Sequence, residues 1–196
     1  MAIVINGSTN VISGVAVGGL PDGIVDTDML AADAVTAPKI GSKTFTSYAI
    51  ICDQKSADTD GGTFTSGGWY TRDLNTEITD PDGIVSISSN KFTLQAGTYL
   101  IKAQAPAYNV ARHMITLYRT SAPSQAHIAY GTPEYTYVGS YVQTYSSLFT
   151  RVTITQATDY EIRHKCTDTM ATFGMGVGAD YGVTETYTIV QIFKEA

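Results

Sequence analysis

One stretch of the chain, Phe92–Ala103, constrains the fold more than any other part of the sequence. Phe92 and Leu94 alternate with polar neighbours, which is the period-2 pattern of a strand with one buried face. A tight reversal is predicted at Gly97, because glycine can take the positive φ that such a turn often needs. The residues after it, beginning with Tyr99, suit a longer strand. We therefore expect Phe92, Gly97 and Tyr99 to form a core motif of a β-protein.

Residues 45–196 continue in the same manner. They form short strand-like segments at regular spacing with turn signals between them, which is typical of a β-sandwich. No segment of this half shows convincing helical periodicity, so we expect an all-β domain. The expected strands cover residues 48–53, 84–87, 92–94, 98–103, 113–119, 126–130, 141–155, 160–165 and 183–193.

The central motif resembles that of a known family. Phe92, four residues, Gly97, one residue and Tyr99 is similar to the central motif of the C1q/TNF-like jelly roll. That family pairs the motif with a hydrophobic final strand, and residues 186–193 supply one here. The resemblance implies a homotrimeric jelly-roll β-sandwich.

A broader resemblance covers about three quarters of the chain, from Tyr48 to Glu195. This part is similar to a module repeated in phage virion proteins, especially fibre-type proteins of phages that infect cyanobacteria. The similarity implies a trimer displayed on a particle, and it does not imply catalysis. Its marks are the segments Gly61–Gly67, Leu74–Ile78, Phe92–Tyr99 and Tyr160–Ile162.

The composition agrees with a protein that associates with copies of itself. Only 15% of the residues are charged, against roughly 25% in a typical soluble domain. Together with 18 Gly and 13 Tyr, this low charge favours an all-β chain with a large subunit interface. A sparsely charged monomer is the alternative.

Charge and hydropathy exclude several classes of partner. The net charge of −6 argues against nucleic acid, because phosphate contacts need clustered Lys and Arg. No hydrophobic run approaches the ~18 residues of a membrane helix, so membrane insertion is not expected. The N-terminus lacks the basic region and the apolar length of a signal peptide. We expect synthesis in a bacterial host cytoplasm and a final place on the virion surface.

Residues 1–44 differ from the rest because they contain no aromatic residue. We interpret them as an extended or helical anchor or stalk, with a short helix that acidic residues cap at its start and that Pro38 ends. Such a short helix is marginal alone, so it would pack on the same segment of two other subunits. A disordered tail is the alternative. The apolar anchor positions are Val25, Met29, Leu30 and Ala32.

No pattern of catalytic or metal-binding residues emerges, so we expect neither an enzyme nor a cofactor. His113, His127 and His164 fall in separate strand-like segments without a metal-ligand partner at local spacing. The segments Asp58–Gly61 and Asp80–Gly83 could offer oxygen ligands to Ca²⁺, as some C1q-like trimers do. Aspartate and glycine are also common turn residues, and the turn is the favoured interpretation.

The two cysteines allow two interpretations. The resemblance implies that the first strand, with Cys52, lies beside the penultimate strand, which ends at Cys166. Neighbouring thiols could form a disulfide if their Cα atoms lie within about 7 Å. A cytoplasmic origin disfavours that bond and favours two reduced, buried thiols.

The distribution of aromatic residues is the best functional indication. Tyrosine combines a large, stiff apolar surface with a polar tip, which suits protein interfaces and sugar faces. On strands these residues would pack in the core or at the trimer axis, whereas Tyr135 and Tyr137 in a loop are candidates for an exposed patch. The trimer-interface or surface-contact candidates are Tyr130, Tyr135, Tyr137, Tyr141, Tyr145 and Trp69.

The sequence thus predicts a phage virion structural protein. Residues 45–196 would form a trimeric knob, and residues 1–44 would attach it to other virion proteins of the capsid or tail. The knob is either a capsid decoration protein or a tail-fibre head that adheres to a host surface glycan. The alternative is a soluble glycan-binding or glycan-cleaving module. Cleavage would need paired carboxylates, and Glu134, Glu161 and Glu185 show no local pairing.

Overall fold

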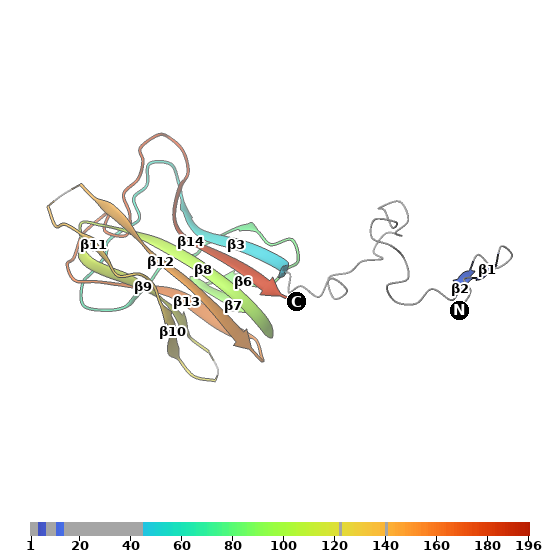
Figure 1. Ribbon diagram of the computed structural model, residues 1–196. Helices are drawn as coiled ribbons and strands as arrows, with labels where there is room; N and C mark the ends of the chain where they lie inside the picture. The colour runs from blue at the N-terminus through green and yellow to red at the C-terminus, as the bar shows by residue number, and fades with distance from the viewer. Residues whose placement is uncertain (1–3, 7–10, 14–44, 122, 140) are drawn as a thin grey trace. The chain divides into compact units, whose positions relative to one another are not determined.

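The computed structural model describes residues 4–6, 11–13, 45–121, 123–139 and 141–196. The chain divides into two compact units, Met1–Lys43 and Thr44–Ala196. In the first unit, strands β1 (Val4–Asn6) and β2 (Val11–Ser13) pair antiparallel (Figure 1). The expected anchor helix, with Val25, Met29, Leu30 and Ala32, lies outside the described residues.

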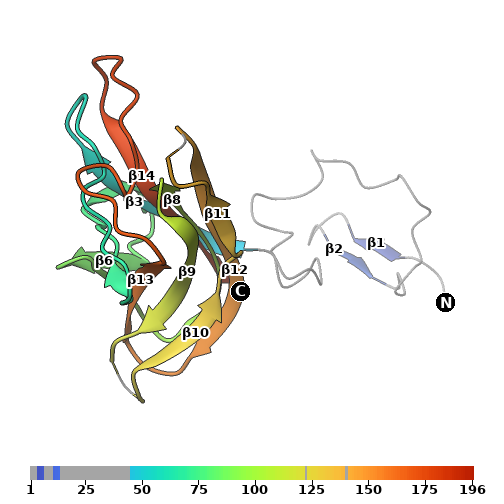
Figure 2. The ribbon, with the colours of Figure 1, turned by 90° about the vertical axis from the view of Figure 1, so that its left-hand side faces the viewer.

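The second unit is a sandwich of two antiparallel sheets, and every regular element described in it is a strand (Figures 1 and 2). Accordingly, no helix among the described residues has the length and apolarity to cross a membrane. The five-stranded sheet has the order β12-β8-β14-β3-β5. The seven-stranded sheet has the order β10-β9-β13-β7-β6, with β11 beside β9 and β4 beside β13. The strands are β3 (Phe45–Lys55), β4 (Tyr70–Thr71), β5 (Thr76–Thr79), β6 (Val85–Ser88), β7 (Lys91–Leu94), β8 (Gly97–Tyr108), β9 (Ala111–Arg119), β10 (Ala126–Tyr130), β11 (Glu134–Thr136), β12 (Gln143–Ile154), β13 (Thr158–Cys166) and β14 (Glu185–Glu195).

The core between the sheets includes both aromatic residues of the central motif. Phe92 and Tyr99 are fully buried, and the Phe92 ring stacks on Tyr160 with 5.7 Å between ring centroids. The Tyr99 hydroxyl donates a 3.0 Å hydrogen bond to the Gln95 carbonyl. The turn before Gly97 does not make a hairpin, however, because β7 and β8 belong to different sheets. It passes the chain across the core, so Phe92 and Tyr99 reach that core from opposite sides.

One edge of the sandwich is closed by the connection between β10 and β11. The Gly131 N–H donates to the Ile115 carbonyl of the seven-stranded sheet at 2.9 Å. The next residue, Thr132, donates its N–H to the Ser147 carbonyl of the five-stranded sheet at 2.8 Å. A Cβ added at Gly131 would lie 2.9 Å from that Ser147 oxygen. Glycine is therefore required where the backbone joins the two sheets.

Strand register places the two ends of the domain. Phe45 pairs with Glu195, and at the other end of the same strand pair Lys55 pairs with Glu185. Both ends of the sandwich chain therefore lie at one end of the sheet. Residues 137–139 and 141–142 lie at the opposite end, since β8 and β12 pair there through Tyr108 and Gln143. The connection 167–184 leads into β14 at the same end, where Glu185 pairs with Lys55.

Candidate functional site

The outward face of the five-stranded sheet carries apolar side chains although nothing in the described chain covers it. Leu100 on β8 pairs with Phe193 on β14, and Phe193 pairs with Tyr48 on β3, so the three form a row across the sheet. The residues between them along each strand, such as Ile101 and Ile192, point into the core. Tyr48 is 45% exposed. We call this surface the apolar face, and its apolar residues are Phe45, Tyr48, Ile50, Leu100, Phe149, Ile189 and Phe193. Lys102, Gln104 and Gln191 lie among them on the same side of the sheet.

The edge beside the apolar face is also apolar. Phe149 on the edge strand β12 is 68% exposed, and Tyr130 at the end of β10 is also exposed. Both residues line a cavity of about 660 Å³ beside the connection between β10 and β11. We call this surface the edge cavity, and it is lined by Lys102, Tyr130, Gly131, Thr132, Pro133, Ser147, Leu148 and Phe149.

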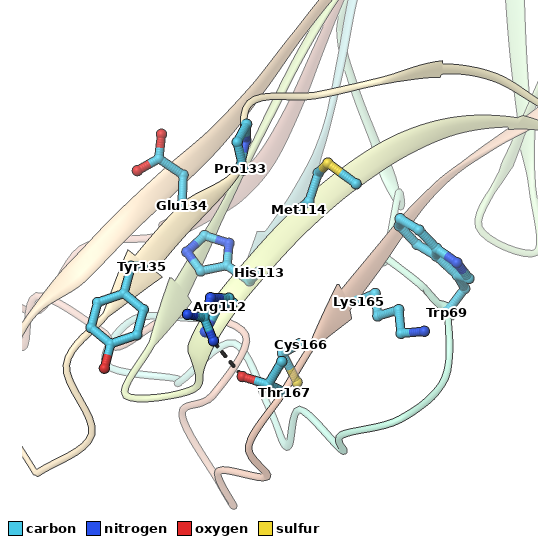
Figure 3. A pocket seen from close by; sticks show the side chains of 10 residues that line it. All are labelled: Trp69, Arg112, His113, Met114, Pro133, Glu134, Tyr135, Lys165, Cys166 and Thr167. Atoms are coloured by element: carbon cyan, nitrogen blue, oxygen red, sulfur yellow. Dashed lines mark hydrogen bonds between the residues drawn. The ribbon is translucent and has the colours of Figure 1, made fainter.

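A second open cavity, of about 610 Å³, lies on the outward face of the seven-stranded sheet. Arg112 and Met114 of β9 and Lys165 of β13 form its floor, because Lys165 pairs with Met114. Figure 3 shows Tyr135 and Trp69 on opposite sides of this floor. We call it the sheet cavity, and it is lined by Trp69, Arg112, His113, Met114, Pro133, Glu134, Tyr135, Lys165, Cys166 and Thr167.

An aromatic cluster holds Trp69 at the rim of the sheet cavity. The Trp69 ring lies 5.0 Å from the His127 ring and 6.0 Å from the Tyr130 ring, centroid to centroid. His127 also packs edge-on against Tyr118 at 4.9 Å, and the Arg163 guanidinium lies 3.5 Å from the centre of the Tyr118 ring. These contacts fix the Trp69 side chain, which would otherwise sit freely in a loop.

Buried polar side chains lie beneath the sheet cavity. His113 Nδ1 is 3.0 Å from His164 Nε2, and His113 Nε2 is 2.7 Å from the Thr144 hydroxyl. Burial lowers the pKa of His113 to about 4 and that of His164 well below its ordinary value, and the nearby Arg72 guanidinium lowers both further. Both rings are therefore neutral at neutral pH. His164 Nδ1 has no hydrogen-bond partner among the described residues.

Arg72 is a fully buried cation without a carboxylate in direct contact among the described residues. Its Nε donates to the Thr188 hydroxyl at 2.8 Å, and one terminal nitrogen donates to the Met175 carbonyl at 2.7 Å. Desolvation lowers the pKa of the guanidinium to about 10, so it stays charged. The side chain reaches from the end of β4 to β14 and thus bridges the two sheets.

The strands that carry the two cysteines are not adjacent, which corrects the expectation drawn from the resemblance. Cys52 lies on β3 of the five-stranded sheet, whereas Cys166 ends β13 of the seven-stranded sheet. The first strand instead pairs with the last strand, β14, and with β5. Both thiols are buried and free.

The aspartate-rich loops use their carboxylates as internal acceptors. Asp80 accepts the N–H groups of Ile84 and Val85, both at 2.9 Å, which fixes the turn before β6. Asp58 accepts the Gly182 N–H at 2.8 Å, and Asp60 similarly binds the connection before β14. Among the described residues, no group of three His, Cys, Asp or Glu side chains could hold a metal ion.

The Cys166 thiol at the sheet cavity and the three carboxylates weighed for glycan cleavage each have a defined environment. Burial raises the pKa of Cys166 to about 12, so the thiol is not an activated nucleophile. The carboxylates weighed for glycan cleavage lie on three different strands. Glu134 accepts from Thr132, Glu161 is paired with Arg163 at 2.7 Å, and Glu185 accepts the Ala179 N–H at 2.9 Å.

The structure brings some of the predicted contact residues together and separates others. Trp69 lies with Tyr130 in the aromatic cluster and with Tyr135 at the sheet cavity. Tyr145 is exposed on β12, where its hydroxyl accepts from the Gln143 side chain at 3.0 Å. Tyr141 is 96% exposed, and Tyr137 is also exposed, in the connection at the end of the domain opposite the chain ends. Tyr130 and Tyr145 are exposed and so do not pack in the core of the single chain, while their place at a trimer axis stays a prediction.

Several residues of the two candidate surfaces were not singled out from the sequence. Leu100, Phe149 and Phe193 on the apolar face were assigned no role, although one signal was available. In the run Ile189–Phe193, the residues on both sides of the strand are apolar except for Gln191. Such a pattern indicates a strand that is covered on both faces. Arg112 and Lys165 carried no local signal, because only the pairing of β9 with β13 brings them together.

Comparisons with solved structures identify the fold. The chain is similar to Eiger, a TNF from S. frugiperda, with a TM-score of 0.53 and 10% identity over 78% of this chain and 94% of that one. It is similar to murine APRIL at pH 8.0, with a TM-score of 0.50 and 8% identity over 76% of this chain and 98% of that one. The globular domain of zebrafish complement 1qA protein gives a TM-score of 0.46 and 15% identity over 75% and 95% of the two chains.

The likenesses to Eiger and to APRIL define the class of fold, which is the TNF-like jelly roll, and the predicted all-β jelly-roll sandwich is confirmed. No protein-family model and no curated protein matches the chain.

Proposed function

We propose that this chain is a virion structural protein of a bacteriophage. Its jelly roll forms a homotrimeric knob on the particle surface, and residues 1–44 attach the knob to other virion proteins. The knob serves either as a capsid decoration protein or as a tail-fibre head that adheres to the host.

The proposal of a trimer rests on the exposed apolar face. Exposed rows such as Leu100, Phe193 and Tyr48 leave water when a protein surface covers them, which stabilises association by roughly 25 cal/mol per Å² of apolar area. The face spans several strands of a regular sheet, so it needs a broad partner. A second copy offers one, because its edge beside Phe149 and Tyr130 is apolar as well.

Contact between the edge cavity of one copy and the apolar face of the next joins two surfaces of the chain whose only shared apolar residue is Phe149. Such heterologous contacts close into a ring when the rotation between neighbours permits it, and the resemblance to trimeric jelly rolls favours three copies. The low charged fraction of 15% supports the same arrangement, because subunit interfaces are depleted in charge.

Two observations support the phage role. The motifs between Tyr48 and Glu195 resemble those of phage virion modules, and the two ends of the domain differ. Because Phe45 pairs with Glu195, attachment through residues 1–44 would begin at one end of the knob. The exposed tyrosines Tyr137 and Tyr141 lie at the other end, where a displayed knob would meet its surroundings.

Sedimentation equilibrium of the full chain at micromolar concentration tests the trimer. We expect a single species with three times the mass of the chain. A monomer at that concentration contradicts the proposal, because a stable interface of this kind buries on the order of 800 Å² per partner.

Deletion of residues 1–44 tests the attachment. The truncated chain should remain trimeric and melt at nearly the same temperature, but it should no longer enter particles when the phage is grown with it. Normal incorporation would assign attachment to the knob. Copy number then separates the two placements, since decoration implies many copies on the head and a fibre implies a few trimers on the tail.

A further inference from the structure

The sheet cavity has the size and position of a ligand site. Its volume of about 610 Å³ falls within the ~300–1,000 Å³ of small-molecule sites. Its floor is the face of a regular sheet, so the positions of Arg112, Met114 and Lys165 are fixed by strand pairing. The backbone N–H of Arg112 also donates to the Thr167 hydroxyl at 3.1 Å, which holds this end of the floor (Figure 3).

The charge of the cavity opposes that of the chain. Arg112 and Lys165 are both exposed, and neither forms an ion pair with a described residue. Glu134 is the one carboxylate among the lining residues. A chain with a net charge of −6 thus presents two unpaired cations over one carboxylate. This local surplus of positive charge selects an anionic ligand.

The walls of the cavity are aromatic. Trp69 is held on one side by the His127 and Tyr130 rings, and Tyr135 stands on the other side with 53% of its surface exposed (Figure 3). The negative face of an aromatic ring attracts the C–H groups on the apolar face of a sugar ring. The His127 and Tyr130 contacts hold the Trp69 ring in place, so less side-chain freedom is lost on binding.

We infer that the sheet cavity binds an acidic saccharide. Arg112 and Lys165 bind its carboxylate or sulfate group, and Arg112 can donate two parallel hydrogen bonds to that group. The sugar rings pack on Trp69 and Tyr135, and Glu134 accepts hydrogen bonds from sugar hydroxyls.

Strand pairing disfavours an acidic peptide as the ligand. An extended peptide gains much of its affinity by adding a strand to an open sheet edge. Here the floor strand β9 is already paired on both sides, with β13 on one and with β10 and β11 on the other. The inference does not depend on the trimer or on a particle, because the site lies within one chain and on the sheet opposite the apolar face.

Isothermal titration calorimetry of the full chain tests the inference. The probes are trigalacturonate, its uncharged methyl ester, sialyllactose and a heparin-derived tetrasaccharide. We expect at least one acidic probe to bind, and affinity to fall as salt is raised. For trigalacturonate, the methyl ester should bind at least tenfold more weakly.

The variants assign binding to the cavity. Arg112→Gln and Lys165→Gln should each weaken binding of the acidic probe about tenfold, and Trp69→Ala should weaken it as well. Arg119→Gln is the matched control, because Arg119 lies on the same strand β9 but outside the cavity, and it should change affinity less than twofold.

Three results would overturn the inference. These are no binding by any acidic probe, equal binding of trigalacturonate and its ester, and displacement of the acidic saccharide by a polyglutamate peptide at lower concentration than by the saccharide itself. Sedimentation of the unmodified chain separates this test from that of the trimer. If the unmodified chain is trimeric but binds no acidic probe, only the saccharide site is contradicted, whereas a monomer that binds an acidic probe contradicts only the trimer.

Discussion

The two sheets of the sandwich share one core and differ in the chemistry of their outward faces. On the five-stranded sheet, Leu100 and Phe193 face outward between residues that are themselves in the core. On the seven-stranded sheet, the outward positions hold Arg163 over Tyr118 and Glu161 beside Arg163. This difference is the basis on which we propose a protein partner for the first sheet and an acidic saccharide for the second.

The largest effect is expected from a charge on the apolar face. Leu100→Asp places a carboxylate where the trimer would bury it, and a buried unpaired charge costs several kcal/mol. The variant should sediment as a folded monomer. Lys165→Glu, a charge reversal on the opposite sheet, should remain trimeric. A trimer in both variants would show that the apolar face is not the interface.

Substitutions of two phenylalanines, one in the core and one on the apolar face, should have different effects. Phe92→Ala should lose about 3–5 kcal/mol of unfolding free energy, because Phe92 is fully buried and a cavity remains. Domains have only about 5–15 kcal/mol in total, so expression and melting temperature should fall sharply. Phe149→Ala removes the same group from the surface and should weaken the trimer with little effect on the unfolding of the single chain. Thermal unfolding measures both, and equal melting of Phe92→Ala and the parent would contradict the core motif.

Acid should destabilise the domain through the buried histidines of the seven-stranded sheet. The folded-state pKa of His113 is about 4, below the ordinary 6.5, so the unfolded chain binds more protons between these values. This contribution to stability is complete above pH 6.5 and is lost as pH falls toward 4, by up to about 3 kcal/mol. Urea unfolding from pH 7.5 to 4.5 should show a smaller decline for His113→Gln than for the control His127→Gln. Equal declines would contradict this assignment.

A smaller effect is expected where the two sheets are joined. Gly131→Ala places a Cβ 2.9 Å from the Ser147 carbonyl oxygen, and backbone must shift at a cost of about 1–3 kcal/mol. Gly178→Ala is the control, because its nearest atom would be 3.5 Å away. Chemical denaturation compares the unfolding free energies of the two variants. Equal values would show that the backbone at Gly131 can shift without loss of stability.

The smallest effect is expected at the end of the domain opposite the chain ends. Tyr141 is 96% exposed, so Tyr141→Ser should change unfolding free energy by less than about 0.5 kcal/mol. A loss of more than about 2 kcal/mol of unfolding free energy, measured by thermal unfolding, would show that Tyr141 packs against the domain and is not exposed.

The sequence predicted those parts of the fold that local periodicity governs. Alternation around Phe92 and the apolar run before Phe193 were enough for the strands and the sandwich. Local patterns cannot show which strands pair, and for this reason Cys52 was wrongly placed beside the strand of Cys166. The short strand β11 was missed because three residues carry no periodicity.

The candidate sites were predictable only in part. Trp69 and Tyr135 were recognised as contact residues by their type, but their meeting at one cavity depends on the pairing of β9 with its neighbours. Arg112 and Lys165 are far apart in the chain and resemble ordinary surface residues. Arginine is usually exposed to water, so nothing in the sequence indicated that Arg72 is buried, and only the folded structure shows it.

The register that brings Phe45 beside Glu195 has a mechanical consequence. A knob held at residue 45 and loaded at its opposite end would carry the force along β3. The hydrogen bonds of an antiparallel pair run perpendicular to the strands, so such a force shears many of them together. A load applied at both chain ends would instead open the pair of β3 and β14 one hydrogen bond at a time. Tethering at one end and loading at the other therefore places the sheet in its more force-resistant orientation.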